Sequence, residues 1–183
     1  MEGRRVGYSR TTITELMVPA YANFGGKIHG GVLLSLMDKV AYACASKHAG
    51  TYCVTVSVDT VNFLQPVEVG ELVSLKASVN YVGSSSLVVG IRVIAEDVRS
   101  ATVKHTNTSY VTMVAKYEDH DQVVVPPLIL EGHEDIRRFL AALKRKRLRS
   151  YAKGKMDDYR KEFKLDDGVR SILEDQRCIV SLA

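Results

Sequence analysis

The segment formed by residues 28–45 places the tightest limit on how this chain of 183 residues can fold. It consists almost wholly of apolar or small residues, with Gly30 and Gly31 near its start and Gly50 beyond its end. Glycine just after the last apolar residue commonly ends a helix, so a helix is expected from Gly30 to about His48. A helix that is apolar on nearly every side meets the condition for a sheet to curl about it.

One carboxylate interrupts this apolar segment. Asp38, beside Lys39, stands where the helix is expected to meet the core. A buried carboxylate is costly unless something satisfies or uses it. The N–H groups at the helix start, near Gly30 and Gly31, favour developing negative charge. A carboxylate near a site that polarises a carbonyl group indicates hydrolysis; the alternative is a structural carboxylate, satisfied by the backbone or by Lys39.

Composition excludes several classes of protein. Hydrophobic residues make up 46% of the chain and charged residues 25%, a balance typical of globular domains. The segment 28–45 is interrupted by charge and does not fit a membrane span, and the N-terminus lacks the apolar core of a signal peptide. Cys44, Cys53 and Cys178 show no metal-ligand spacing and fit reduced thiols. We therefore expect a cytoplasmic protein without a metal.

Strand-like segments surround the expected helix. Residues 11–18 precede it, and a loop over residues 19–28 holds proline, asparagine and glycine residues typical of turns. Four further strand-like segments follow the helix, at residues 52–63, 71–81, 86–96 and 105–117. Alternation of apolar with polar or small residues in the third indicates a strand with one buried face. This order predicts an α+β fold in which an antiparallel sheet curls about one long helix.

Several spaced motifs carry a resemblance to a known family. They are Asn23-x-x-Gly26-x-x-His29-Gly30-Gly31-Val32, then Met37-Asp38-Lys39, the segment 54–59, Phe63, Pro66, Gly70-Glu71 and the segment 80–86. Together they resemble the hot-dog fold acyl-CoA thioesterases, in the group that includes bacterial short- to medium-chain and brain-type acyl-CoA hydrolases. The resemblance covers about residues 11–118.

The resemblance implies both an architecture and a site. The architecture is a long helix wrapped by a curved antiparallel sheet, with dimers formed edge to edge and commonly assembled as trimers of dimers. The catalytic pair is Asp38 and Asn23, and the Asn of one protomer is expected to face the Asp of the other. No cofactor is implied beyond the coenzyme A of the substrate.

Thioester hydrolysis gives each of these residues a role. Asp38 would act as general base or as nucleophile, and Asn23 would orient the water or the carbonyl group. The N–H of Gly30 or Gly31 would donate to the oxyanion. His29 is interpreted as a helix-start residue whose backbone shapes the substrate site. For Asn23, the alternative is a turn residue in a glycine-rich loop.

Two groups of polar residues are candidates for binding coenzyme A. Ser57 and Asp59 share one strand face with Thr55 by alternation, and line the pantetheine channel or face a polar interface. The second group follows Gly83 and comprises Ser84, Ser85 and Ser86. These serines either donate to the nucleotide end of coenzyme A or form a plain hairpin turn.

The C-terminal segment differs from the rest in charge. Residues 131–183 carry 14 Lys and Arg against 10 Asp and Glu, whereas residues 1–130 carry 11 of each. This asymmetry predicts a hot-dog domain of residues 1–130 and a basic helical extension of residues 131–183. Within the extension we expect helices at 134–153 and 156–174, with a basic run at 144–149. The run is interpreted as solvated or assembly-stabilising; the alternatives are binding the coenzyme A phosphate, nucleic acid or an anionic membrane surface.

The favoured hypothesis is a homo-oligomeric enzyme that hydrolyses acyl-CoA, with no nucleic acid partner and no membrane insertion. One alternative is a non-enzymatic acyl-CoA sensor whose basic tail contacts DNA, although such a sensor has no need of both Asn23 and Asp38. The other is a hot-dog enoyl-CoA hydratase, which would need a catalytic histidine deep in the site. His29 stands at the wrong end of the motif for that role.

Overall fold

The structure is a computed structural model that describes residues 2–117, 123–165, 167–174 and 176–181 of the chain. It divides into two compact units, Met1–Leu143 and Lys144–Ala183. This division falls later than the expected boundary after residue 130, because the first 11 residues of the helix that starts at His133 belong to the first unit.

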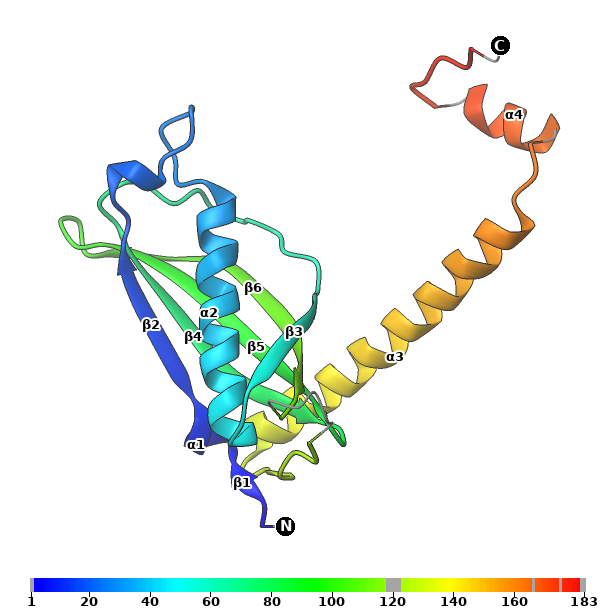
Figure 1. The fold of residues 1–183 in the computed structure, drawn as a ribbon. Coiled ribbons are helices and arrows are strands. Elements are labelled where there is room, and N and C mark those ends of the chain that lie inside the picture. The colour runs from blue at the N-terminus through cyan, green and yellow to red at the C-terminus, as the bar shows by residue number, and fades with distance from the viewer. Residues whose placement is uncertain (1, 118–122, 166, 175, 182–183) are drawn as a thin grey trace. The chain divides into compact units, whose positions relative to one another are not determined.

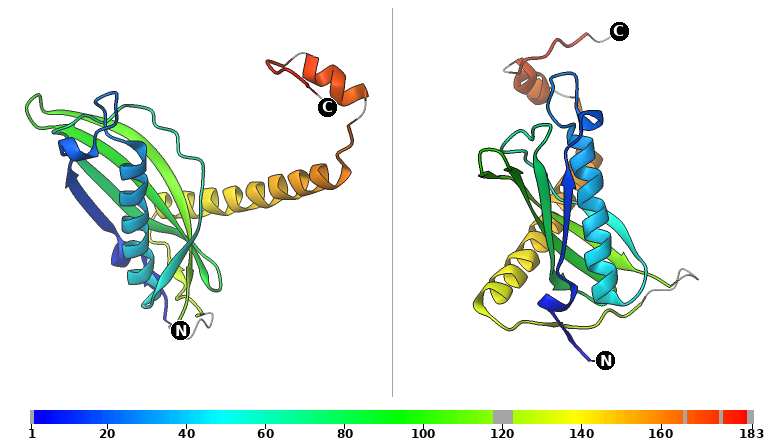
Figure 2. Two further views of the ribbon diagram at one scale, coloured as in Figure 1. Left: turned by 45° about the horizontal axis from the view of Figure 1, so that its top comes forward. Right: turned by 90° about the vertical axis from the view of Figure 1, so that its left-hand side faces the viewer.

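A curved antiparallel sheet and one long helix make up most of the first unit (Figure 1). The helix is α2 (Gly30–Ala49), and the strands are β2 (Thr11–Leu16), β3 (Cys53–Val58), β4 (Leu72–Val82), β5 (Ser86–Asp97) and β6 (Thr102–Ala115). The sheet order is β2-β4-β5-β6-β3, with every neighbouring pair antiparallel. The sheet curves around α2 (Figure 2), which confirms the expected α+β hot-dog architecture.

Local chemistry explains where α2 begins and ends. At its start, the Nδ1 atom of His29 accepts a hydrogen bond from the N–H of Gly31 at 2.8 Å, which satisfies one helix-end donor. At its end, Gly50 adopts the left-handed conformation with φ 76°, and its N–H donates to the Ser46 carbonyl. The helix ends at Ala49, one residue beyond the expected end.

The core lies between α2 and the inner face of the sheet. Leu33, Met37 and Val40 of α2 pack against strand residues such as Leu75 and Ile91. Burying each such side chain contributes about 1.5–3 kcal/mol relative to exposure. The apolar positions of β5 that were expected to face inward are fully buried, while their neighbours are less so, which confirms the alternating pattern.

Two of the cysteines belong to this core. Cys44 and Cys53 are 0% and 1% exposed. Burial raises the pKa of the Cys44 thiol to about 12 and also raises the pKa of Cys53. Both side chains therefore pack as small apolar groups.

One face of α2 is left exposed by the described residues of the first unit. Its exposed positions recur at intervals of three and four residues and are Gly31, Leu34, Ser35, Asp38, Lys39 and Tyr42. Leu34 and Tyr42 are 41% and 43% exposed. The apolar members of this face are therefore open to contact with another surface.

Some elements differ from their predicted bounds. β3 ends at Val58 instead of Phe63. The segment after Val58 joins β6 through isolated backbone hydrogen bonds and not through a continuous ladder. Asp59 N–H donates to the Tyr110 carbonyl, and Leu64 N–H donates to the Thr106 carbonyl. The sequence also did not predict several short elements. These are β1 (Arg4–Arg5), α1 (Val6–Ser9), the 3-10 helix η1 (Pro19–Tyr21) and β7 (Leu128–Ile129), which pairs in parallel with β1.

The basic extension is helical, with bounds other than those expected. Helix α3 (His133–Glu162) continues through Gly154, so the predicted break after residue 153 is wrong, and α4 covers only Asp167–Glu174. Within the first unit, the Phe139 ring of α3 packs against Tyr81 of β4, with ring centroids 5.1 Å apart. None of the helices in the described residues is long and apolar enough to cross a membrane.

The C-terminal end of α2 depends on Arg4, which generates a prediction. The Nη1 atom of Arg4 donates to the carbonyls of Lys47 and His48 at 3.0 and 2.7 Å, where carbonyl groups lack partners within the helix. Arg4→Ala is expected to lower the free energy of unfolding by about 1–3 kcal/mol, measured by urea denaturation.

Arg5→Ala is the matched control for this measurement. Arg5 pairs with Glu131 at 3.1 Å, and their side chains are 69% and 50% exposed. Removing such a surface pair is expected to change stability by at most about 1 kcal/mol. Equal effects of the two substitutions would contradict the role given to Arg4.

Candidate active site

Asp38 lies on the uncovered face of α2. Its carboxylate is exposed, so the expectation of a buried carboxylate is wrong for the chain taken alone. The Oγ1 atom of Thr55, on β3, donates a hydrogen bond to Oδ1 of Asp38 at 2.6 Å. A hydrogen bond to a charged oxygen is strong and fixes the carboxylate beside the edge strand.

A bulge in β3 follows directly after Thr55 and separates it from Ser57. Thr55 pairs with Met113 of β6, whereas Ser57 pairs with Thr112, so Val56 is the extra residue. The bulge breaks the alternation, and Ser57 therefore faces away from the side that Thr55 faces. The expectation that Thr55, Ser57 and Asp59 share one face is wrong for this reason.

A hollow of about 360 Å³ adjoins this carboxylate. Asp38, Lys39 and Tyr42 line it from α2, and residues 52–55 line it from β3 and the residue before that strand. The hollow therefore lies where the helix and the edge strand meet, with the Asp38–Thr55 hydrogen bond in its wall.

Asn23 shapes the loop that precedes α2. Its Oδ1 atom accepts hydrogen bonds from the N–H groups of Gly25 and Lys27, at 2.9 and 3.2 Å. Both partners are donors, which assigns the oxygen to this side of the amide. The side chain therefore has the turn role considered as its alternative, and its NH₂ group is the part left to act as a donor.

Gly30 and Gly31, at the start of α2, differ in whether their backbone N–H group already donates a hydrogen bond. The N–H of Gly31 is occupied by the His29 side chain, and a Cβ at Gly31 would lie 2.9 Å from His29 Nδ1. The N–H of Gly30, at the first helical position, makes no hydrogen bond to another described residue. Of the two glycines, Gly30 is the better candidate for an oxyanion donor, and His29 acts as a helix cap through its ring.

Helix geometry separates this end of α2 from Asp38. Eight residues from Gly30 to Asp38 span about 12 Å along the helix axis. The loop that carries Asn23 lies beyond the N-terminal end of the helix (Figure 1). One thioester carbonyl cannot contact Asp38 and the helix start of the same protomer, because both must lie within hydrogen-bonding reach of the reacting atoms.

The serine turn is part of the β4–β5 hairpin. The N–H of Gly83 donates to the Ser86 carbonyl at 2.7 Å, and the carbonyls of Ser85 and Ser84 accept from Ala115 and Val125 at 2.8 and 2.7 Å. These backbone groups hold the turn in place. Binding of coenzyme A by the side chains of Ser84, Ser85 and Ser86 stays a prediction, as it does for Ser57 and Asp59.

Thr55 is the site residue to which sequence reasoning gave no catalytic role. Its position in the segment 54–59 indicated a lining of the pantetheine channel or a polar interface, because the sequence does not show that β3 lies beside Asp38. The described residues contain no group of three or more His, Cys, Asp or Glu side chains arranged to hold a metal ion. The arrangement offers a fixed carboxylate, a hydroxyl group and an adjacent hollow, which together suit the activation of a water or attack on a carbonyl carbon.

Comparison with known proteins assigns the family. Residues 25–102 match the model of the Thioesterase superfamily. The protein VdlD of Helicobacter pylori is 43% identical over 142 residues, which cover 78% of this chain and 81% of VdlD. The crystal structure of an apo-hexameric acyl-CoA thioesterase superposes with a TM-score of 0.80 at 32% identity, covering 83% of this chain and 97% of that chain.

A second solved structure agrees with the first. The acyl-CoA hydrolase of Staphylococcus aureus, in complex with butyryl coenzyme A, coenzyme A and coenzyme A disulfide, superposes with a TM-score of 0.76 at 26% identity. The match covers 87% of this chain and 99% of the hydrolase. The chain therefore belongs to the hot-dog fold acyl-CoA thioesterases, a family of thioester hydrolases.

Proposed function

We propose that this chain hydrolyses acyl-CoA to a free carboxylic acid and coenzyme A, at sites that form between two protomers. The observation that carries the proposal is the Asp38–Thr55 hydrogen bond of 2.6 Å beside a hollow on the uncovered face of α2. A carboxylate held in this way, in a chain of the acyl-CoA thioesterase family, is placed to attack a thioester or to activate water.

The spacing of three residues supports this assignment. Structures of the Staphylococcus aureus hydrolase include variants in which an Asp, an Asn or a Thr is replaced by alanine. In that enzyme the Asn precedes the Asp by 15 residues and the Thr follows it by 17. Asn23 precedes Asp38 by 15 residues here, and Thr55 follows it by 17. The same three residue types at the same separations favour Asn23, Asp38 and Thr55 as the reacting group.

In the reaction, Thr55 holds Oδ1 of Asp38 and leaves the other carboxylate oxygen for chemistry. As a general base, Asp38 takes a proton from water while the hydroxide attacks the thioester carbon. The tetrahedral intermediate then expels the thiolate of coenzyme A, which takes up the proton. As a nucleophile, Asp38 would instead form a mixed anhydride that water hydrolyses. When water attacks the Asp38 carbon of this anhydride, a single turnover in labelled water leaves ¹⁸O in Asp38. The general-base route never labels Asp38, so ¹⁸O in Asp38 would identify the nucleophilic route.

The second protomer supplies the oxyanion donors in this proposal. Because the start of α2 lies about 12 Å from Asp38 within one chain, the NH₂ group of Asn23 and the N–H of Gly30 would serve the Asp38 of the partner. Loss of one such donor typically costs about 3 kcal/mol of transition-state stabilisation.

Two features of the fold support the dimer that this site requires. β3 is an edge strand that pairs with β6 and has no second strand partner in the described part of the chain. An open edge of this kind is a template for pairing with another chain. Next to it, the uncovered face of α2 presents Leu34 and Tyr42, which a second copy would bury. We propose an edge-to-edge dimer that assembles further as a trimer of dimers. Two solved structures that this chain resembles are described as hexameric, which supports a hexamer.

The first test is release of coenzyme A from a series of acyl-CoA thioesters. Asp38→Asn keeps the size of the side chain and removes its charge, so turnover is expected to fall at least about a hundredfold while folding and assembly persist. Asp97→Asn, the same substitution at the end of β5, is the control and is expected to keep wild-type turnover. Tight acyl-CoA binding without turnover by the wild type would favour the sensor hypothesis instead.

Thr55 provides an independent prediction. Thr55→Val preserves the branched shape and removes the hydroxyl group that orients Asp38, so kcat is expected to fall about 10–100-fold, with KM changed little. Thr55→Ser keeps a hydroxyl group and is expected to stay within about threefold of wild type. If the valine variant retained full kcat, the hydrogen bond would have no part in the reaction.

A further inference from the structure

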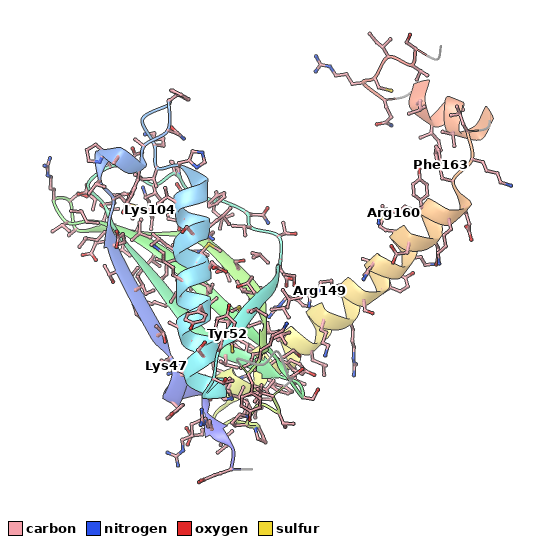
Figure 3. All side chains as sticks on the ribbon, viewed as in Figure 1. Lys47, Tyr52, Lys104, Arg149, Arg160 and Phe163 are labelled. Carbon is pink, nitrogen blue, oxygen red and sulfur yellow. The ribbon has the colours of Figure 1, made fainter. Side chains whose placement is uncertain are left out.

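Two tyrosines bound the hollow at the end away from the Asp38–Thr55 pair. Tyr42 follows Asp38 by four residues on α2, so both side chains lie on the same face, about 6 Å apart along the helix axis. Tyr52 comes just before β3, and its ring centroid lies 6.0 Å from that of Tyr42 at an interplanar angle of 59°. Figure 3 shows Tyr52 beside the C-terminal half of α2.

The two rings are in contact. Aromatic pairs pack with centroids 4.5–7 Å apart, so a separation of 6.0 Å leaves no space for a hydrocarbon chain to pass between them. The rings also join the two walls of the hollow, because Tyr42 comes from the helix and Tyr52 from the strand side. They therefore bound one end of the hollow that begins at Asp38.

The chemistry of the wall identifies the part of the substrate that fits there. Cys53 is buried and Val54 half-buried, and with the two rings they make this part of the wall largely apolar. Coenzyme A is polar along the pantetheine arm and charged at its phosphates, whereas the acyl chain is apolar. With the thioester carbonyl at Asp38, the acyl chain is the part of the substrate that gains most by entering this hollow.

We propose that Tyr42 and Tyr52 form the end wall of the acyl-binding site and set the acyl chain length. This inference rests on the proposed hydrolysis of acyl-CoA at Asp38, and it names short acyl chains as the substrate class. The distance from Asp38 to Tyr42, about one helical turn, limits the acyl chain to a few carbons. Longer chains meet the paired rings.

The test is the chain-length profile of kcat/KM, measured with straight-chain acyl-CoA substrates from two to sixteen carbons. Wild type is expected to be most active on short chains. Tyr42→Ala and Tyr52→Ala each open the end wall, so the optimum is expected to move to longer chains. For a substrate two carbons beyond the wild-type optimum, kcat/KM is expected to rise about tenfold, the effect of burying two further methylenes.

Two control variants separate the end wall from general effects on the protein. Tyr42→Phe keeps the ring and is expected to keep the wild-type profile. Tyr8→Ala removes a tyrosine that is 58% exposed in another part of the fold, and is also expected to keep it. Unchanged profiles in both alanine variants at the end wall, with activity retained, would overturn the proposal. If Tyr42→Ala does not fold, Tyr52→Ala tests the same wall from the other side.

Binding of acyl-CoA thioether analogues separates this proposal from the proposed hydrolysis. These analogues cannot be hydrolysed, and calorimetry gives their Kd as a function of chain length. The alanine variants are expected to bind long-chain analogues about tenfold more tightly than wild type does. That result would support the end wall even if wild type hydrolysed no acyl-CoA. A different outcome would refute the end wall and leave the proposed hydrolysis standing. In that outcome, wild type hydrolyses acyl-CoA, and wild type and all variants show the same dependence of Kd on chain length.

Discussion

The uncovered face of α2 is the constraint on which the account of this protein depends. The sheet buries one side of the helix and leaves a stripe that includes Leu34, Asp38 and Tyr42. Apolar side chains on this stripe favour contact with another surface, and Asp38 on the same stripe is the candidate reacting group. In the proposed dimer, assembly and chemistry use the same face, because the surface that covers this stripe also completes the site.

Helix length is the reason why the proposed site is divided between two chains. The N–H groups that stabilise a negative charge are at the start of α2, and the carboxylate lies about 12 Å further along it. A single protomer cannot bring both to one carbonyl group. Two α2 helices that run past each other at a dimer interface can bring both groups to one carbonyl. In that arrangement the N-terminal end of each helix lies beside the middle of the other.

Much of this arrangement could be predicted from the sequence, since it rests on strong local signals. Gly50 marked the end of α2, and Asp38 stood out as the charge in an apolar segment. The exposure of Asp38 could not be predicted, because periodicity shows which positions are apolar but not which neighbour covers them. The contact of Thr55 with Asp38 could not be predicted, because alternation along one strand does not show which residue of α2 lies beside it. The bulge at Val56, which turns Ser57 to the other face, depends on pairing with β6. Similarly, the charged tail did not show that α3 continues through Gly154.

Complementation between two inactive variants tests most directly whether the site is shared. Asn23→Asp keeps the oxygen that accepts from Gly25 and Lys27 but loses the NH₂ donors, and Asp38→Asn loses the carboxylate. A mixed dimer would hold one doubly altered site and one intact site, so random mixing is expected to restore about a quarter of wild-type activity per protomer. A mixture confirmed to contain mixed dimers but no more active than the separate variants would contradict a shared site.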